Sequence, residues 1–225
     1  MKPEVFFPRR GLTALLLLST SLLSSSEARA DAFTGTGSSG AANLSKSRLG
    51  LVYIGFSGKT GSSLDSATGV GVEFQRERQF SWASYFLKFR MESSSATKTF
   101  DDSGTNRSLA YKYLAGFGAL GFKWSPFQGT ASGLNLYLGA AVDLGFAQIT
   151  LPANAAYTSV KSSDSNMATG YELQAGFSFP IGGRGSQNDN WGLFFEAAYR
   201  QITSSLQGKS SFDLGGIQFS GGFYW

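Results

Sequence analysis

The residues of this chain that could do chemistry are charged side chains set in stretches of alternating apolar and polar residues. Seven of them lie on the polar face of such stretches: Glu73, Lys88, Arg90, Asp143, Glu172, Glu196 and Arg200. Lys112 or Lys123 is a further candidate for the same face. Such a set could line a conduction path, or its members could neutralise one another in a packed ionic core. The near balance of the two signs favours mutual pairing.

Two of these charges constrain how the pairing can run. Glu196 and Arg200 are four residues apart on one strand face, about 13 Å at ~3.3 Å per residue, which is too far for a direct ion pair. Each should therefore pair with a charge from another strand. We expect Glu172 or Asp143 as the partner of Arg200, and Lys88 or Arg90 as the partner of Glu196.

Enzymatic chemistry is limited by the residue types that the chain lacks. It has no histidine and no cysteine. Ser–His and Asp–His hydrolysis need an imidazole to carry the proton, and transition-metal sites depend on imidazole or thiolate ligands. Ser–Lys chemistry stays open, but no spacing points to it. The sequence therefore predicts no enzyme, no catalytic residues, no metal site and no cofactor.

The elements that must position the charges are strands. Eight segments alternate apolar and polar residues with a period of two, separated by stretches rich in Gly, Ser, Asn and Asp. Four are clear, at 134–146, 171–181, 191–200 and 216–225, and four are weaker, at 49–56, 70–75, 85–91 and 111–124. In the segment at 111–124 the parity changes near Gly116 to Gly121, which a β-bulge would explain.

The length of the clearest segment separates a membrane barrel from a soluble sandwich. It runs for 13 residues, whereas globular strands are commonly ~5–6 residues long and membrane barrel strands need about 9–11. One face is apolar and the other carries small, polar or charged residues. We predict an all-β fold, an eight-stranded antiparallel up-and-down transmembrane β-barrel.

The N-terminal region predicts export. Residues 1–30 have a basic start, an apolar Leu-rich stretch and a small-x-small site at Ala28-Arg29-Ala30, as in a cleaved signal peptide. We expect residues 31–47 to be a flexible periplasmic tail and residues 48–225 to be the barrel. The formal net charge is +4 without a run of Lys or Arg, so no nucleic-acid partner is predicted.

The same topology predicts the two rims. With both termini in the periplasm, all four tryptophans fall at one rim as an interface girdle: Trp82, Trp124, Trp191 and Trp225. Tyr111, Tyr113, Tyr171 and Tyr199 then fall near the opposite ends of their strands. The outer loops would be 57–67, 93–106, 150–167 and 203–210, which is where binding functions usually lie.

The last strand resembles the C-terminal assembly signal of outer-membrane barrels, through Phe219, Phe223 and Trp225. Gly221 departs from that pattern, which usually has a bulkier residue there. Residues 48–225 as a whole resemble the small outer-membrane β-barrel superfamily of the OmpA/OmpX/OmpW kind. The resemblance implies the cell outer membrane of a Gram-negative bacterium. It also implies contact with outer-membrane lipid and lipopolysaccharide, and with the barrel-assembly machinery.

The functional expectation follows from the resemblance and from the residues together. Members of that superfamily are structural anchors, adhesion or immune-evasion proteins, narrow channels and, in a few cases, enzymes with histidine-dependent sites. We expect a non-enzymatic structural or surface-interaction barrel with an interior filled by side chains. Its outer loops either bind an extracellular ligand or are simple solvated connections, and their composition favours neither. The alternative is a narrow, porin-like channel for small or hydrophobic solutes.

Overall fold

A computed structural model describes residues 45–56, 67–79, 82–126, 134–152, 161–181, 191–207 and 211–225. The predicted signal peptide and residues 31–44 of the predicted tail lie outside these ranges, and so does most of the loop predicted at 57–67. Among the residues that the structure describes, no helix is long and apolar enough to cross a membrane.

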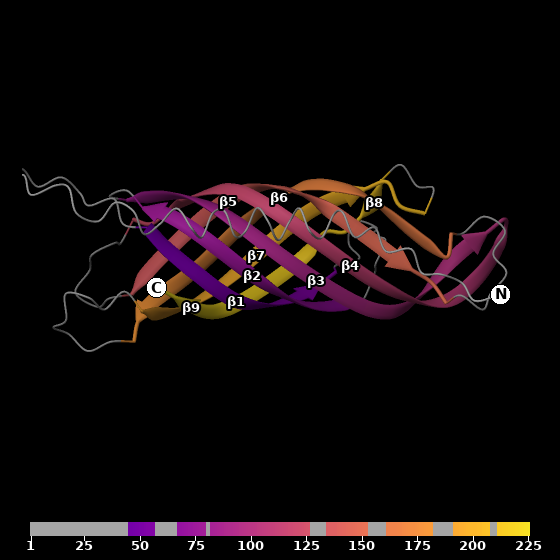
Figure 1. Ribbon diagram of the computed structural model, residues 1–225, viewed down its shortest axis with the longest axis horizontal. Coiled ribbons are helices and arrows are strands. Elements are labelled where there is room, and N and C mark those ends of the chain that lie inside the picture. Colours follow the sequence, from indigo (N-terminus) through magenta and orange to yellow (C-terminus); the bar gives the residue numbers. More distant parts are fainter. Residues whose placement is uncertain are drawn as a thin grey trace, which may run out of the picture. The chain divides into compact units, whose positions relative to one another are not determined.

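The described chain forms one closed antiparallel barrel (Figure 1). Each strand pairs with the next along the chain, and the last long strand pairs with the first, from Arg48–Tyr224 to Gly55–Ile217. A two-residue strand, β8 (Phe212–Asp213), adds a short pairing at the end of β7. The eight long strands are β1 (Ser45–Gly55), β2 (Thr68–Gln79), β3 (Ala83–Asp102), β4 (Thr105–Trp124), β5 (Asn135–Thr150), β6 (Ser163–Pro180), β7 (Gly192–Ser204) and β9 (Gly216–Tyr224).

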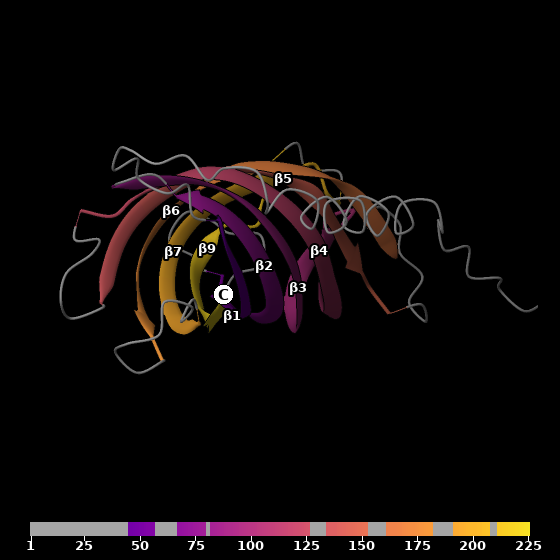
Figure 2. The ribbon, with the colours of Figure 1, turned by 60° about the vertical axis from the view of Figure 1, so that its left-hand side comes forward.

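Closure removes the free sheet edges, as a span through lipid requires, because lipid offers no partner for unpaired backbone groups. We call the end that carries Ser45 and Trp225 the terminal end, and the opposite end the hairpin end. Figure 2 shows the strands following one another around the barrel wall. The predicted fold class, an eight-stranded antiparallel up-and-down barrel, is confirmed.

Alternation along each strand separates an apolar outer face from a mixed inner face. On β5, Leu138 and Val142 point outward and are 54% and 68% exposed, while Asp143 is fully buried inside. The structure also shows which face of β1 points outward. Leu49, Leu51 and Tyr53 are exposed, and the residues between them are buried. Between the two rims the outer face is mainly apolar and suited to contact with lipid.

The bulge expected in β4 is absent. The register of β4 with β3 runs unbroken from Ala83–Trp124 to Asp102–Thr105, and its register with β5 is equally regular. The apparent change of parity arises because β4 places aromatic side chains on both faces. Phe117 is buried inside near the hairpin end, whereas Leu120 and Phe122 are exposed outside.

The prediction of a loop at 93–106 is wrong, because nearly all of these residues belong to the strands β3 and β4. The two strands pair as far as Asp102–Thr105, and a two-residue turn at Ser103 and Gly104 joins them. Both turn residues have positive φ, 54° and 83°, as a tight hairpin turn requires. The Gly104 amide donates a hydrogen bond of 2.8 Å to the Asp101 carboxylate, which stabilises the turn.

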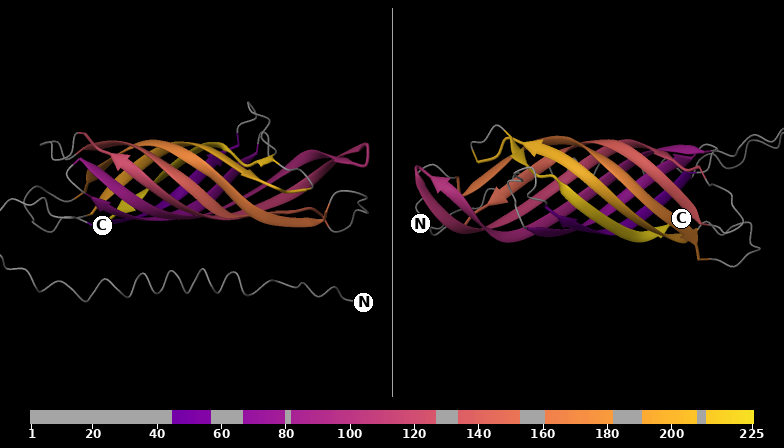
Figure 3. Two further views of the ribbon diagram at one scale, coloured as in Figure 1. Left: turned by 90° about the horizontal axis from the view of Figure 1, so that it is seen from above. Right: turned by 180° about the vertical axis from the view of Figure 1, so that it is seen from behind.

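This hairpin extends past its neighbours. β2 pairs with β3 only as far as Ser94, and β5 pairs with β4 only as far as Lys112. The hairpin formed by residues 95–111, which we call the long hairpin, projects beyond the ends of the adjacent strands (Figure 3). The predicted loops at 150–167 and 203–210 are shorter than expected, since β6 already begins at Ser163 and β7 ends at Ser204.

Interior aromatic rings lie against glycines of neighbouring strands. A Cβ on Gly121 would lie 2.3 Å from Phe86, its pairing partner on β3, and a Cβ on Gly176 would lie 2.5 Å from the Tyr137 hydroxyl. Gly145 stands in the same relation to Phe117. In each pair the missing side chain makes room for a ring inside a narrow barrel.

Gly121→Ala should therefore destabilise the barrel. The new methyl group would overlap the Phe86 ring and the Ala140 carbonyl oxygen, and such overpacking typically costs about 1–3 kcal/mol. Urea unfolding in lipid vesicles measures the change. Gly116→Ala is the matched control on the same strand, because a Cβ there meets nothing within 4 Å. Equal stability of the two variants would contradict the packing argument.

Candidate functional site: the ionic interior and the rims

The seven charged residues predicted to face one space all lie buried inside the barrel. Four further charges join them: Arg48, Glu77, Glu92 and Lys123. Of the two open candidates, Lys123 is fully buried inside, while Lys112 faces outward. Among the described residues, these eleven charges are five cations and six carboxylates, contributed by every long strand except β9.

Lys88 on β3 lies at the centre of this set. Its ammonium group donates hydrogen bonds of 2.8 Å each to Glu172 on β6 and Glu196 on β7, and one of 3.0 Å to Gln174. Glu73 lies 3.9 Å away as a third carboxylate. The expected pairing of Glu196 with Lys88 is therefore present. Lys88 therefore links β3 to β6 and β7, which are distant from it in the sequence.

A second group lies next to Lys88 toward the hairpin end. The Arg90 guanidinium binds Glu172 at 3.0 Å and Asp143 at 2.9 Å, and its Nε lies 3.3 Å from Glu92. Glu92 in turn accepts hydrogen bonds from Arg200 at 2.8 Å and from Tyr113 at 2.7 Å.

The prediction that Glu172 or Asp143 is the partner of Arg200 is wrong, and Asp143 is bound by Arg90 instead. Glu172 is its register neighbour on β6, but Glu172 is already bound by Lys88 and Arg90. Arg200 instead reaches across the barrel to Glu92 on β3, with Nη1–Oε2 at 2.8 Å. The sequence does not predict Glu92 as an interior charge, because it lies just beyond the alternating segment at 85–91 while the strand itself continues to Asp102.

The third group occupies the terminal end. Arg48 on β1 binds Glu77 at 3.0 Å and donates a hydrogen bond of 2.9 Å to the Tyr137 hydroxyl. Lys123 lies 3.2 Å from Glu196 and 4.5 Å from the centre of the Tyr137 ring. Tyr137 also donates to Glu196 at 3.0 Å, so this group is continuous with the one around Lys88.

The hairpin end of the interior is apolar. A cluster of buried hydrophobic residues fills it, and we call this cluster the apolar layer: Val52, Ile54, Phe56, Ala67, Tyr111, Tyr113, Ala115, Phe117, Ala147, Ile149, Leu151, Ala168, Ile202, Leu206, Phe212 and Leu214. Phe117 faces the ionic groups, with its ring centre 5.4 Å from the Arg90 guanidinium and 5.2 Å from that of Arg200. Ions moving along the axis would have to cross this layer.

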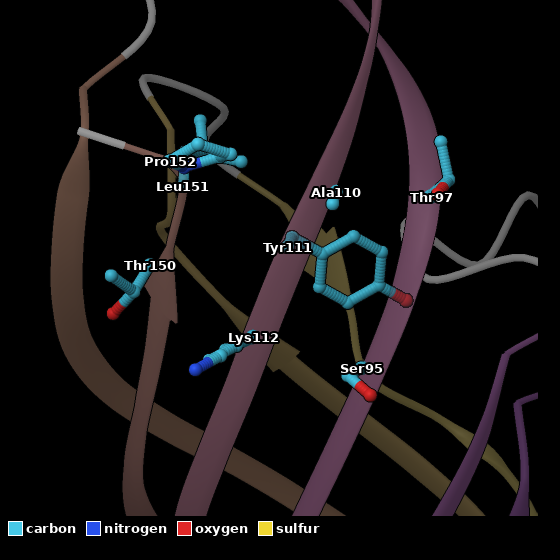
Figure 4. Close-up of a pocket in the computed structure, with 8 residues that line it drawn as sticks. All are labelled: Ser95, Thr97, Ala110, Tyr111, Lys112, Thr150, Leu151 and Pro152. Carbon is cyan, nitrogen blue, oxygen red and sulfur yellow. The ribbon is translucent and has the colours of Figure 1, made fainter. Parts of the chain in front are cut away.

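A groove of about 630 Å³ lies where the long hairpin leaves the barrel (Figure 4). Ser95 and Thr97 of β3 border it on one side, and Thr150 at the end of β5 borders it on the other. Lys112 and the Tyr111 ring project from β4 between them, toward opposite sides of the strand. Hydroxyl groups and an amine therefore meet at this surface hollow, whereas the Tyr111 ring is buried in the barrel interior.

The four predicted girdle tryptophans all belong to the terminal end and face outward, between 40% and 60% exposed. Trp82 accepts a hydrogen bond from the Ser125 amide, next to Trp124, while the rings of Trp191 and Trp225 are 6.1 Å apart. Of the tyrosines expected at the opposite ends, Tyr171 and Tyr199 face outward. Tyr111 and Tyr113 do not, because they point into the apolar layer.

The residues predicted as an assembly signal lie on the outer face of β9. Phe219, Phe223 and Trp225 are 54%, 52% and 40% exposed. The ring of Phe195 on β7 covers Gly221, since a Cβ there would lie 3.1 Å from it. A neighbouring strand thus supplies the bulk that this position lacks.

In the described ranges, no group of three or more His, Cys, Asp or Glu residues is placed to hold a metal ion. The interior carboxylates contact ammonium and guanidinium groups instead. The geometry of the interior therefore serves mutual neutralisation of charge.

Comparison with solved structures identifies the fold. The crystal structure of Neisserial surface protein A (NspA) is similar with a TM-score of 0.50 and 15% identity, over 80% of this chain and 94% of that chain. Ail, the attachment invasion locus protein of Yersinia pestis, gives 0.39 and 13%, over 80% and 98%. Ail in complex with the heparin analogue sucrose octasulfate gives 0.39 and 12%, over 80% and 99%. No family model and no curated protein sequence matches the chain.

Arg200→Ala should clearly lower the stability of the barrel. It removes the nearest cation from buried Glu92, and breaking a buried pair typically costs about 3–5 kcal/mol. Denaturant unfolding in vesicles gives the value. Lys161→Ala is the control, because that side chain is 63% exposed and exposed pairs contribute about 0–1 kcal/mol. A loss no larger than that of the control would mean that water solvates Glu92 in place of Arg200.

Proposed function

Because the chain has the fold of a small outer-membrane β-barrel, we propose that it is a non-enzymatic outer-membrane protein with a structural or surface-interaction role. Its terminal end faces the periplasm and its hairpin end faces the exterior. The long hairpin supports this orientation, because outer-membrane barrels have short periplasmic turns and longer extracellular connections.

The observation that carries the proposal is the filled interior. Lys88, Lys123, Asp143 and Glu172 are fully buried, and the apolar layer lies between them and the hairpin end. An ion entering from the periplasm would have to break several buried ion pairs and then pass an uncharged, tightly packed layer. Both steps are costly because the interior offers little solvation.

Surface interaction is supported by the long hairpin and the groove at its base. The hairpin carries an outward row of hydroxyl and small side chains, including Ser95, Thr97 and Ser108. The groove adds the Lys112 ammonium. These groups suit an extracellular ligand that offers hydrogen bonds and negative charge, and lipopolysaccharide at the outer leaflet is one such molecule.

A narrow channel is the second candidate, and one observation favours it. Asp143 Oδ2 and Gln174 Nε2 are buried and find no hydrogen-bond partner among the residues that the structure describes. Buried polar atoms in that state are commonly satisfied by water. Water beside Asp143 would be the start of a polar path.

We expect the purified barrel to be closed to ions. In planar bilayers, inserted wild-type protein should give no stepwise currents, and Arg200→Ala should give none either, because the apolar layer remains intact. Insertion is verified on the same samples by the mobility difference between unboiled and boiled protein in a denaturing gel. Regular conductance steps whose ion selectivity changes in Arg200→Ala would establish the channel instead.

Orientation and the assembly signal are tested together on intact cells. An epitope inserted between Ser103 and Gly104 should be labelled by antibody from outside. Phe219→Ala with Phe223→Ala should strongly reduce labelling while leaving refolding in detergent nearly normal, since both side chains are exposed on the outer face.

The matched control for that experiment is Leu144→Ala with Phe146→Ala, which removes two equally exposed side chains from β5. Labelling should stay near the wild-type level in this control. An epitope accessible only after the cells are opened would reverse the orientation. Equal losses in both double variants would show that general surface hydrophobicity, and not the last strand, directs assembly.

A further inference from the structure

The apolar outer face of the barrel is interrupted near the terminal end of β2. Arg76 and Arg78 follow Val70, Val72 and Phe74 on the outward face of that strand, and both are exposed. Within the strands that the structure describes, the other outward-facing charged residues are Asp101 and Lys112, both at the hairpin end. The cost of exposing an arginine to lipid falls toward the membrane interfaces, so guanidinium groups at this level of the barrel suit contact with lipid headgroups.

A surface hollow of about 460 Å³ lies beside these arginines, lined by Ser45, Arg76, Arg78, Tyr85, Leu87 and Leu120. Glu77 and Phe86 also border it, but their side chains point into the barrel. The Glu77 carboxylate is bound there by Arg48 at 3.0 Å and by Ser84 at 2.7 Å. The outward lining of the hollow is thus cationic, hydroxylic and apolar.

The register arranges this lining in two rows. Arg78 pairs with Ser45 on one side and Tyr85 on the other, so the row at the terminal end is polar. Arg76 pairs with Leu87, which pairs with Leu120, so the next row leads onto the apolar surface. A headgroup in the polar row would leave its acyl chains on the apolar one.

Two arginines at alternate positions can act on one phosphate. Their Cα atoms are roughly 7 Å apart at ~3.3 Å per residue, and the long side chains can lay their stems on apolar surface while the guanidinium groups converge. Guanidinium groups bind phosphate oxygens in a bidentate manner, and Tyr85 adds an aromatic ring suited to the interface.

We propose that Arg76 and Arg78 bind the phosphate of an anionic glycerophospholipid of the inner leaflet. The inference rests on the proposed function, because the periplasmic position of the terminal end determines that the neighbouring lipid is a phospholipid and not lipopolysaccharide. The lipid occupies the hollow with its phosphate at the two guanidinium groups and its acyl chains along Leu87 and Leu120.

The test is native mass spectrometry of barrels released from nanodiscs that contain equal amounts of phosphatidylglycerol and phosphatidylcholine. Wild-type protein should retain one phosphatidylglycerol in preference to phosphatidylcholine. Arg76→Gln with Arg78→Gln should reduce that retained fraction by about tenfold or more, as expected for the loss of charge-assisted hydrogen bonds. Lys161→Gln, which removes an exposed cation at the hairpin end, should retain the lipid normally.

The outcomes separate this site from the proposed function. Wild-type protein that does not enter the nanodisc as a heat-modifiable barrel would refute the membrane function itself. Inserted barrels that retain no lipid, or that retain it equally in the double glutamine variant, would refute only the lipid site. Displacement of the lipid by excess inorganic phosphate would show a general phosphate site and overturn the assignment to a phospholipid.

Discussion

The small circumference of the barrel is the constraint on which the other features depend. Eight strands enclose a space just wide enough for their own side chains, so every inward residue must contact residues from across the barrel. The long interior side chains therefore meet near the axis, where Lys88 binds carboxylates from β6 and β7. Charges can be held there only because nearly every one has an opposite charge within reach.

The interior has a charged region and an apolar region that follow one another along the barrel axis. The terminal end and the middle hold the paired charges, with Tyr137 and Tyr113 as hydrogen-bonding links to Glu196 and Glu92. The hairpin end is closed by hydrophobic packing, and Phe117 forms the boundary by facing two guanidinium groups. Water and ions therefore face two different barriers in series, one of desolvated charge pairs and one of apolar side chains.

Much of this arrangement could be predicted from the sequence, because period-two alternation specifies the inner and outer faces wherever one face is uniformly apolar. That rule placed Glu73, Lys88 and Glu172 inside. It failed near the hairpin end, where the inner face is apolar as well. There alternation does not distinguish the inward rings of Tyr111 and Tyr113 from lipid-facing rings, and Phe117 suggests a bulge that the strand does not have.

The strand residues of the long hairpin were not predicted, because this part of the chain is polar. Strand residues with hydroxyl side chains on a water-exposed ribbon have the composition of a loop, so Glu92 and the residues after it gave no strand signal. The partner of Arg200 could not be predicted from the sequence either. Arg200 binds Glu92 on a strand that is distant in sequence, because its register neighbour Glu172 is already bound by Arg90. Alternation identifies a face, but which side chains meet across the axis depends on barrel geometry.

The pairs of interior rings and glycines also bear on how the strands find their alignment. A strand displaced by two residues keeps its apolar side toward lipid, so lipid contact alone does not discriminate against that error. Such a slip would, however, bring the rings of Phe86 and Tyr137 against residues other than Gly121 and Gly176, where a Cβ takes up the space that the glycines leave open. The glycines therefore favour one strand alignment over the others, although they contribute no side chain to the interior.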